Sequence, residues 1–187
     1  MKKDYVYFRN RAEQLLNRQW GMLIDGEMVP AMSGKVMDTL DPSTQRVIAQ
    51  VPFAQKEDVD RAVEAAFQAF ETWRKIPVKE RVGYIHQIIS IIKAHKEDLA
   101  LLDALNSGNS LQGMLKDVDL ACDVMSFLAG AALNVTGQTI PSTEKGWHFT
   151  IREPYGVVGR IIPFNHPFMF AATKIVAPIV MGNCIVL

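Results

Sequence analysis

Hydrophobic residues in the central part of the chain recur every three or four positions, a spacing that predicts helices with one buried face. The first helix is expected over residues 56–75. A second helix begins at Pro77, and its pattern continues until Asn, Ser and Gly interrupt it at residues 106–109. Ser110 can cap a third helix, and we expect the three to form one layer. The apolar stripes consist of Val59, Ala62, Val63, Ala66, Phe67, Phe70 and Trp73, then Val82, Ile85, Ile88, Ile89 and Ile92, then Leu111, Met114, Leu115, Val118, Cys122, Met125 and Leu128.

Short apolar segments on either side of these helices predict antiparallel strands. Asp25-Gly26 lies between apolar flanks within residues 22–29, which is the strongest short signal for a hairpin. A turn at Asp41-Pro42 separates two further strands. The remaining expected strands cover residues 36–40, 46–51, 137–143 and 147–152.

The last part of the chain predicts a strand, a helix and a second strand. Residues 157–162 form a β-branched run that suits a strand covered on both faces. Pro167 fits the first turn of a helix, and Gly182 fits its end. Residues 184–187 then form the next strand. Such a unit normally has parallel strands with ligands at their carboxyl ends, and Asn165 is expected at such an end.

Composition narrows the classes of function. The chain has 187 residues, of which 49% are hydrophobic, enough for one core or for one domain and part of another. Lys plus Arg and Asp plus Glu are 20 each, so no overall field favours nucleic acid or an anionic membrane. Residues 1–20 form a charged arm rather than a signal sequence. The most apolar segment is interrupted by charged and helix-breaking residues, so no membrane span is expected. We expect a cytoplasmic protein.

Asn165 is the main candidate for chemistry, because a side-chain amide beside a helix N-terminus can donate to an oxygen that becomes negative. The alternative is that its side chain satisfies backbone groups of the loop, which spacing alone favours. His166 is expected to be an exposed loop residue. Lys174 is either a proton-transfer group or a lysine that extends to the surface. Two cysteines, Cys122 and Cys184, lie in apolar surroundings and without metal-ligand spacing, so we expect core thiols and no metal site.

Residues 153–167 (EPYGVVGRIIPFNHP) and 174–187 (KIVAPIVMGNCIVL) together resemble the aldehyde dehydrogenase superfamily. Residues 24–27, 58–63 and 137–141 agree with it in order, and the resemblance covers residues 20–187. It implies an α/β fold in which a helical layer and antiparallel oligomerisation strands lead into the first β-α-β unit of a Rossmann-like NAD(P)-binding domain that is truncated. The implied divisions are an arm at 1–20, strands and helices of the cofactor domain at 21–136, an oligomerisation-type hairpin at 137–155 and the start of the parallel sheet at 156–187.

The resemblance also implies a function, namely NAD- or NADP-dependent oxidation of a small-molecule aldehyde to a carboxylic acid by a homo-oligomer. Asn165 would be the oxyanion donor, and Lys174 a proton-relay candidate. Residues 161–164 (Ile161, Ile162, Pro163 and Phe164) would pass along the nicotinamide end of the cofactor. Phe164 stands where the family usually has tryptophan. Residues 106–110 depart from the family pattern and are assigned no role.

The family's nucleophilic cysteine and glutamate base have no counterpart in these residues, because Cys184 matches a variable strand position. Acyl transfer through a thiohemiacetal requires a thiolate, so we predict that the 187 residues alone are inactive. The apolar end of the chain leaves an uncovered sheet edge, which predicts a need for a partner or for further chain. Two alternatives are a truncated, non-catalytic assembly or interaction module and a related acyl-phosphate reductase.

Overall fold

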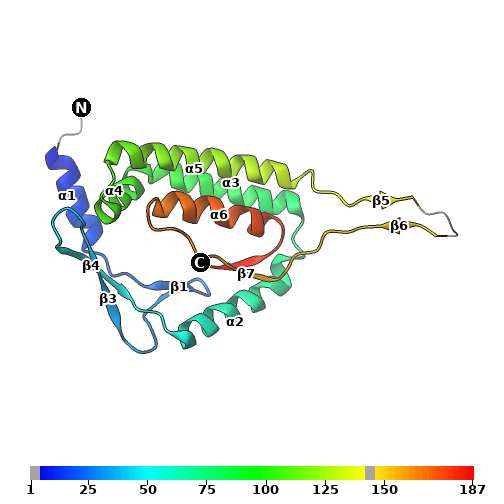
Figure 1. Cartoon of the computed structure of the whole chain (residues 1–187), viewed down its shortest axis with the longest axis horizontal. Helices are drawn as coiled ribbons and strands as arrows, with labels where there is room; N and C mark the ends of the chain where they lie inside the picture. Colours follow the sequence, from blue (N-terminus) through cyan, green and yellow to red (C-terminus); the bar gives the residue numbers. More distant parts are fainter. Residues whose placement is uncertain (1–4, 142–145) are drawn as a thin grey trace.

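The computed structural model describes residues 5–141 and 146–187, which form six helices and four two-stranded sheets (Figure 1). The helices are α1 (Tyr5–Leu16), α2 (Lys56–Trp73), α3 (Val78–Ala94), α4 (Lys96–Ser107), α5 (Leu111–Ala132) and α6 (Pro167–Val180). The strands are β1 (Met22–Ile24), β2 (Glu27–Val29), β3 (Val36–Leu40), β4 (Val47–Pro52), β5 (Thr139–Ile140), β6 (His148–Phe149), β7 (Val157–Gly159) and β8 (Cys184–Val186).

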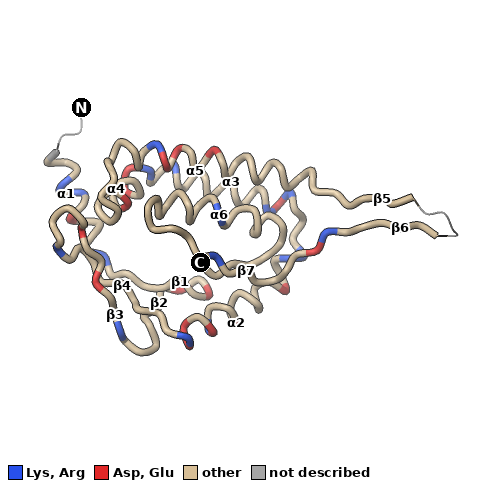
Figure 2. The backbone as a smooth tube through the Cα atoms, in the orientation of Figure 1, with Lys and Arg blue, Asp and Glu red and all other residues tan. Residues whose placement is uncertain are grey.

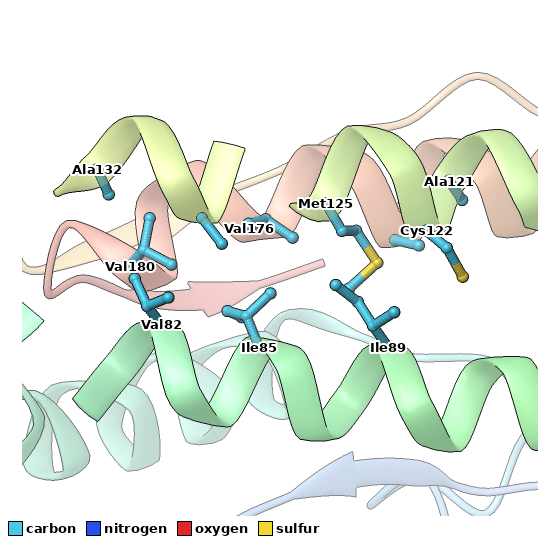
Figure 3. Packing of buried hydrophobic residues seen from close by; sticks show 11 residues of the cluster. Val82, Ile85, Ile89, Ala121, Cys122, Met125, Ala132, Val176 and Val180 are labelled. Carbon is cyan, nitrogen blue, oxygen red and sulfur yellow. The ribbon is translucent and has the colours of Figure 1, made fainter. Parts of the chain in front are cut away.

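The main core lies between α3, α5 and α6, where the predicted apolar stripes meet (Figure 3). Ile85, Met125 and Val176 are fully buried there, one from each helix. Burying a side chain of this size stabilises the fold by about 1.5–3 kcal/mol. Small residues such as Ala121 and Ala129 allow α5 to lie close to its neighbours. These three helices therefore form the rigid body that carries the carboxyl-terminal unit.

The predicted second helix is in fact two helices, which corrects the expectation of three. The chain leaves helical geometry at His95, whose φ and ψ are −106° and 16°, and α4 starts immediately afterwards. This turn brings α4 against α1, where Leu15 packs on Leu101. Arg11 donates to both carboxylate oxygens of Asp98, and this contact holds the pKa of Asp98 below its usual range. The described part of the amino-terminal arm is thus a docked helix.

The apolar stripe of α2 is only partly covered, so the expectation that it is core was wrong in part. Phe70 is buried, whereas Phe67 is 52% exposed and Val59 is 47% exposed. Val59, Ala62 and Ala66 of the stripe line an open cavity of about 930 Å³ together with β1 and β8, whereas Phe67 does not. At its start, α2 is capped by Asp58, whose carboxylate accepts hydrogen bonds from the backbone N–H groups of Gln55 and Met32.

The predicted hairpins are present, with differences in length. Asp25 and Gly26 connect β1 to β2 with φ values of 54° and 78°, the conformation that a tight hairpin turn requires. β5 and β6 pair over two residues each, fewer than predicted, and part of this prediction falls on residues 142–145, outside the described chain. This pair projects away from the body (Figure 1). Figure 2 shows charged positions of both signs along the helices, whereas the described outer part of this arm has none.

The predicted strand-helix-strand unit is confirmed by β7, α6 and β8. β7 and β8 pair in parallel, with Val157 opposite Cys184 and Gly159 opposite Val186. β7 ends at Gly159 rather than at Ile162. The carbonyl of Val186 in β8 accepts a hydrogen bond from the backbone N–H of Arg160, just after β7, at 2.8 Å.

Side chains from three different segments satisfy the carbonyl groups at the end of α6. The indole Nε1 of Trp73 donates to the carbonyl of Ile179 at 3.0 Å, and the Nε of Arg81 donates to that of Val180 at 2.8 Å. The Nδ2 of Asn183 donates to the carbonyl of Pro178 at 3.0 Å. Gly182 follows with a φ of 88°, which ends the helix as predicted. The carboxyl-terminal end of α6 is therefore fixed against α2 and α3.

Candidate functional site

Asn165 lies in the loop of residues 160–166, which joins the carboxyl end of β7 to α6. Its backbone carbonyl accepts a hydrogen bond from the Nδ2 of Asn109 at 2.8 Å. Its own side chain is exposed and makes no hydrogen bond to any residue in the described ranges 5–141 and 146–187. The side-chain amide is therefore free to donate to a ligand, and it does not serve the backbone of its loop.

His166 occupies the position just before α6, and Pro167 is the first helical residue, as predicted. The Nδ1 of His166 lies 2.5 Å from a carboxylate oxygen of Asp117, which comes from α5. The imidazole also meets the ring of Phe170 edge-on, with 6.2 Å between ring centres. The expectation of an exposed loop residue was wrong, because the imidazole is half-buried and held by a carboxylate 49 residues away in the chain.

Asp103 fixes the start of α6 from a third direction. Its side chain is buried, and one carboxylate oxygen accepts the backbone N–H of Phe168 at 3.0 Å. Burial raises the pKa of the Asp103 carboxyl. The hydrogen bond from Phe168 opposes this rise, the charge of Asp117 adds to it, and the charge of His166 opposes it. The three ionisable groups at this end of α6 thus influence one another electrostatically.

Asn109, Asp103 and Asp117 were not among the predicted site residues. Each belongs to α4, α5 or the connection between them, and each reaches a residue at least 49 positions later. No local pattern indicates contacts at such separations. The only available signal was Gly108, which ends α4 with a φ of 76° and leaves Asn109 in a loop.

The residues expected to pass along a cofactor lie in the same loop as Asn165 and are mostly exposed. Ile161 and Phe164 are almost entirely in contact with solvent, at 103% and 89% exposure. Pro163 is also exposed, and Ile162 is half-buried. Large apolar side chains at the carboxyl end of a parallel strand form a surface on which a planar ring system or another polypeptide segment can pack.

Lys174 lies two turns into α6 and is exposed. It lines a second open cavity, of about 780 Å³, between α5, α6 and β7, to which Arg160 also contributes. Its exposure matches the expectation of a lysine that extends to the surface, and Asn165 does not line this cavity.

Neither thiol is placed for nucleophilic chemistry. Cys122 is 2% exposed within the α3, α5 and α6 core, and burial raises the pKa of its thiol. Burial also raises the pKa of the Cys184 thiol at the start of β8. The described residues contain no cluster of three or more His, Cys, Asp or Glu side chains that would hold a metal ion. Within the same residues, no helix is both long enough and apolar enough to cross a bilayer.

Comparison with known sequences identifies relatives along nearly the whole chain. The family model "Aldehyde dehydrogenase family" matches residues 28–187. The aldehyde dehydrogenase tropH of Talaromyces stipitatus is 36% identical over 178 residues, which are 94% of this chain and 35% of that protein. The putative aldehyde dehydrogenase DhaS of Bacillus subtilis is 37% identical over 180 residues, which are 95% of this chain and 36% of that protein.

Solved structures match at the level of the fold as well. An NAD+ complex of an aldehyde dehydrogenase from Bacillus cereus has a TM-score of 0.89 and 38% identity over 94% of this chain and 36% of that one. A betaine aldehyde dehydrogenase from Staphylococcus aureus in complex with NAD+ has a TM-score of 0.90 and 33% identity over 96% of this chain and 36% of that one. The present chain thus spans about a third of the length of these relatives.

Proposed function

This chain belongs to the aldehyde dehydrogenase family, and on that basis we propose that the complete protein containing these residues oxidises an aldehyde to a carboxylic acid with NAD or NADP. The observation that carries the proposal is the state of Asn165. Its backbone is held by Asn109, while its side-chain amide is exposed and without a partner in the described chain. An amide held in this way can donate to a carbonyl oxygen that gains negative charge, and it needs little reorganisation to do so.

The residues of the loop suit a dinucleotide. Ile161, Pro163 and Phe164 expose apolar surface at the carboxyl end of β7, where dinucleotides bind in open α/β sheets. In this proposal these side chains and Ile162 pack along the nicotinamide end and keep water from that side. When bound, the dinucleotide supplies the hydride acceptor. Asn165 then donates a hydrogen bond that stabilises the negative charge on the aldehyde oxygen beside it.

Residues 1–187 by themselves are proposed to be inactive in this reaction. Formation of a thiohemiacetal needs a thiolate, and burial disfavours the thiolate of both Cys122 and Cys184. In this proposal the nucleophile comes from polypeptide outside residues 1–187. Residues 156–187 would start the parallel cofactor sheet, following strands and helices at 21–136 and an amino-terminal arm at 1–20.

Mutation of Asn165 tests the proposal in the complete polypeptide encoded by the reading frame that contains these residues. We expect aldehyde-dependent formation of reduced nicotinamide, measured by absorbance, and a loss of about 10²- to 10³-fold in kcat in Asn165→Ala. Asn165→Asp should be at least as slow, because a carboxylate repels the developing charge. Asn134→Ala is the matched control, since Asn134 is an exposed asparagine in the turn after α5. A kcat for Asn165→Ala equal to that of the control would refute the assigned role.

Lys174 is a secondary candidate in the same reaction, as a proton relay at the surface of the second cavity. Lys174→Met retains the length of the side chain and removes the ammonium group. A relay predicts a lower kcat that added small amine bases restore, with little change in KM. An unchanged kcat would show that Lys174 is only a surface residue and has no role as a proton relay.

A second proposed function is assembly, which the exposed arm favours. Trp147, Phe149 and Ile151 are 87%, 70% and 67% exposed on and beside β6. Residues 137–155 would then form an oligomerisation hairpin that packs on another copy of the chain. Sedimentation velocity should show a homo-oligomer for the wild type. The double variant Trp147→Ser/Phe149→Ser should dissociate into smaller species. If the oligomer persists in the double variant, the arm is not part of the interface. If the wild type assembles but does not oxidise aldehydes, the non-catalytic role is favoured.

A further inference from the structure

Three polar contacts converge on the candidate oxyanion donor Asn165 and on two residues that follow it, His166 and Phe168. Asn109 holds the carbonyl of Asn165, Asp117 holds the imidazole of His166, and Asp103 holds the backbone N–H of Phe168. All three come from α4, α5 and the loop between them, so one rigid unit restrains the whole start of α6. The side-chain amide of Asn165 is left out of this set of contacts.

We infer that Asn109 and the Asp117–His166 pair are positioning residues that hold the Asn165 loop so that its side-chain amide faces a substrate oxygen. The inference rests on the proposed function, and it gives a role to Asn109, within a segment that the sequence left without one. None of the three touches the reacting atoms in this account; they act only through Asn165.

The geometry separates this role from simple helix capping. Asp103 bonds to a backbone N–H of the first turn of α6, which is the ordinary way to satisfy a helix start. Asn109 instead bonds to the carbonyl of Asn165, which precedes the helix. His166 is fixed by its side chain, and the other two contacts hold Asn165 and Phe168. The restraint therefore includes the backbone of the residue that carries the free amide.

The charges around His166 come from two elements. Asp117 on α5 lies in direct contact with the imidazole, and Asp103 on α4 influences it through space. The charged group within α6 itself is Lys174, two turns further along. The hydrogen bond to Asp117 and the edge-on contact with Phe170 fix the orientation of the imidazole, which is what a positioning residue requires.

The first test is a double-mutant cycle on kcat in the complete polypeptide. Asn109→Asp preserves shape but places an acceptor against the Asn165 carbonyl, and we expect a loss of about tenfold or more in kcat with little change in KM, since small displacements of a catalytic group have large effects. The same substitution in an Asn165→Ala background should have almost no further effect, because the group it positions is absent. Equal losses in both backgrounds would overturn the inference.

Variants of His166 and controls make the test specific. His166→Asn keeps a donor that can reach Asp117 and should retain most of the activity, whereas His166→Phe keeps the ring and its contact with Phe170 but should be as slow as Asn109→Asp. Ser110→Ala removes the hydrogen bond from Gly113 that caps α5, so it lowers the unfolding temperature without reaching Asn165. A drop in kcat for Ser110→Ala, matching that of Asn109→Asp, would show that any local loosening suffices and would contradict the assignment.

A second measurement needs no enzymatic activity. Hydrogen exchange followed by mass spectrometry should show faster exchange of residues 160–168 in Asn109→Asp and His166→Phe than in the wild type or Ser110→Ala. Wild-type protein that fails to oxidise aldehydes would overturn the proposed function alone. Unchanged exchange in Asn109→Asp would overturn the positioning role whether or not the protein is an enzyme.

Discussion

Arg81 makes the sharpest prediction about stability, because a buried cation joins α3 to the end of α6. Its side chain is 8% exposed, it donates to the carbonyl of Val180 at 2.8 Å, and it also donates to the carbonyl of Ile76. Burial lowers the pKa of its guanidinium from the ordinary value. Replacing Arg81 by leucine fills much of the same volume but leaves both carbonyl groups without this donor.

The expected magnitude follows from two opposing effects. Each buried carbonyl left unsatisfied costs about 1–3 kcal/mol, so two such groups together cost about 2–6 kcal/mol. Removing a buried charge relieves part of its desolvation penalty, which favours the lower half of that range. We expect Arg81→Leu to lower the free energy of unfolding by about 2–4 kcal/mol. Arg81→Lys retains the charge and one donor direction and should lose about half as much.

Urea unfolding of the 187-residue chain, followed by circular dichroism, measures this difference. With a slope of about 2 kcal/mol per molar urea, the midpoint for Arg81→Leu should fall by about 1–2 M. Lys79→Ala is the matched control, because Lys79 is exposed on the same helix. A midpoint for Arg81→Leu within the error of the control, at an unchanged slope, would show that these two contacts do not hold α6 in place.

Three further predictions concern other parts of the fold. Hydrogen bonds from the backbone N–H groups of Gln55 and Met32 hold the pKa of the Asp58 carboxyl below its ordinary 3.8. The stability that this carboxylate contributes is therefore present above pH 3.8 and is lost as pH falls through the lowered pKa. In acid titrations of unfolding, Asp58→Asn should flatten this loss of stability. Met125 is 1% exposed, so Met125→Ala should cost about 2–5 kcal/mol and Met125→Leu less than about 1.5 kcal/mol in the urea assay, and similar costs would contradict tight packing there. Burial raises the pKa of the Cys122 thiol, so in a Cys184→Ser background Ellman's reagent should react rapidly only after unfolding, and a fast-reacting Cys122 in the native protein would argue against its core placement.

Local patterns predicted those elements whose signals are complete within a short segment. Ser110 caps α5 by accepting from the backbone N–H of Gly113 at 3.1 Å, as its position before an apolar stripe indicated. Pro167 and Gly182 mark the two ends of α6 correctly. In each case the residue type itself satisfies or ends the helix, so no distant partner is needed for the prediction.

Predictions failed where the structure depends on distant partners. The break at His95 exists because α4 packs on α1 and α5, while the periodicity of the sequence runs through it with no helix-breaking residue. The stripe of α2 predicts a buried face, but periodicity does not say what covers that face, and Phe67 remains half-exposed. β7 covers only Val157–Gly159 of the apolar run at residues 157–162, and pairing with a strand distant in sequence is not indicated by the pattern of that run.

The start of α6 at the candidate site depends both on local signals and on distant partners. Fixing the backbone of one residue costs about 1–2 kcal/mol, and a typical hydrogen bond returns a net 0.5–1.5 kcal/mol. Three such bonds therefore offset the ordering of about two or three residues, which is too few for the whole loop of residues 160–166 but matches the three residues that the bonds hold, Asn165, His166 and Phe168. The exposed residues Ile161, Pro163 and Phe164 have no comparable restraint, since their apolar side chains lack a cover in the described chain. A bound dinucleotide or another polypeptide segment would supply it, so the donor end of this loop is preorganised while the proposed cofactor end becomes ordered on binding.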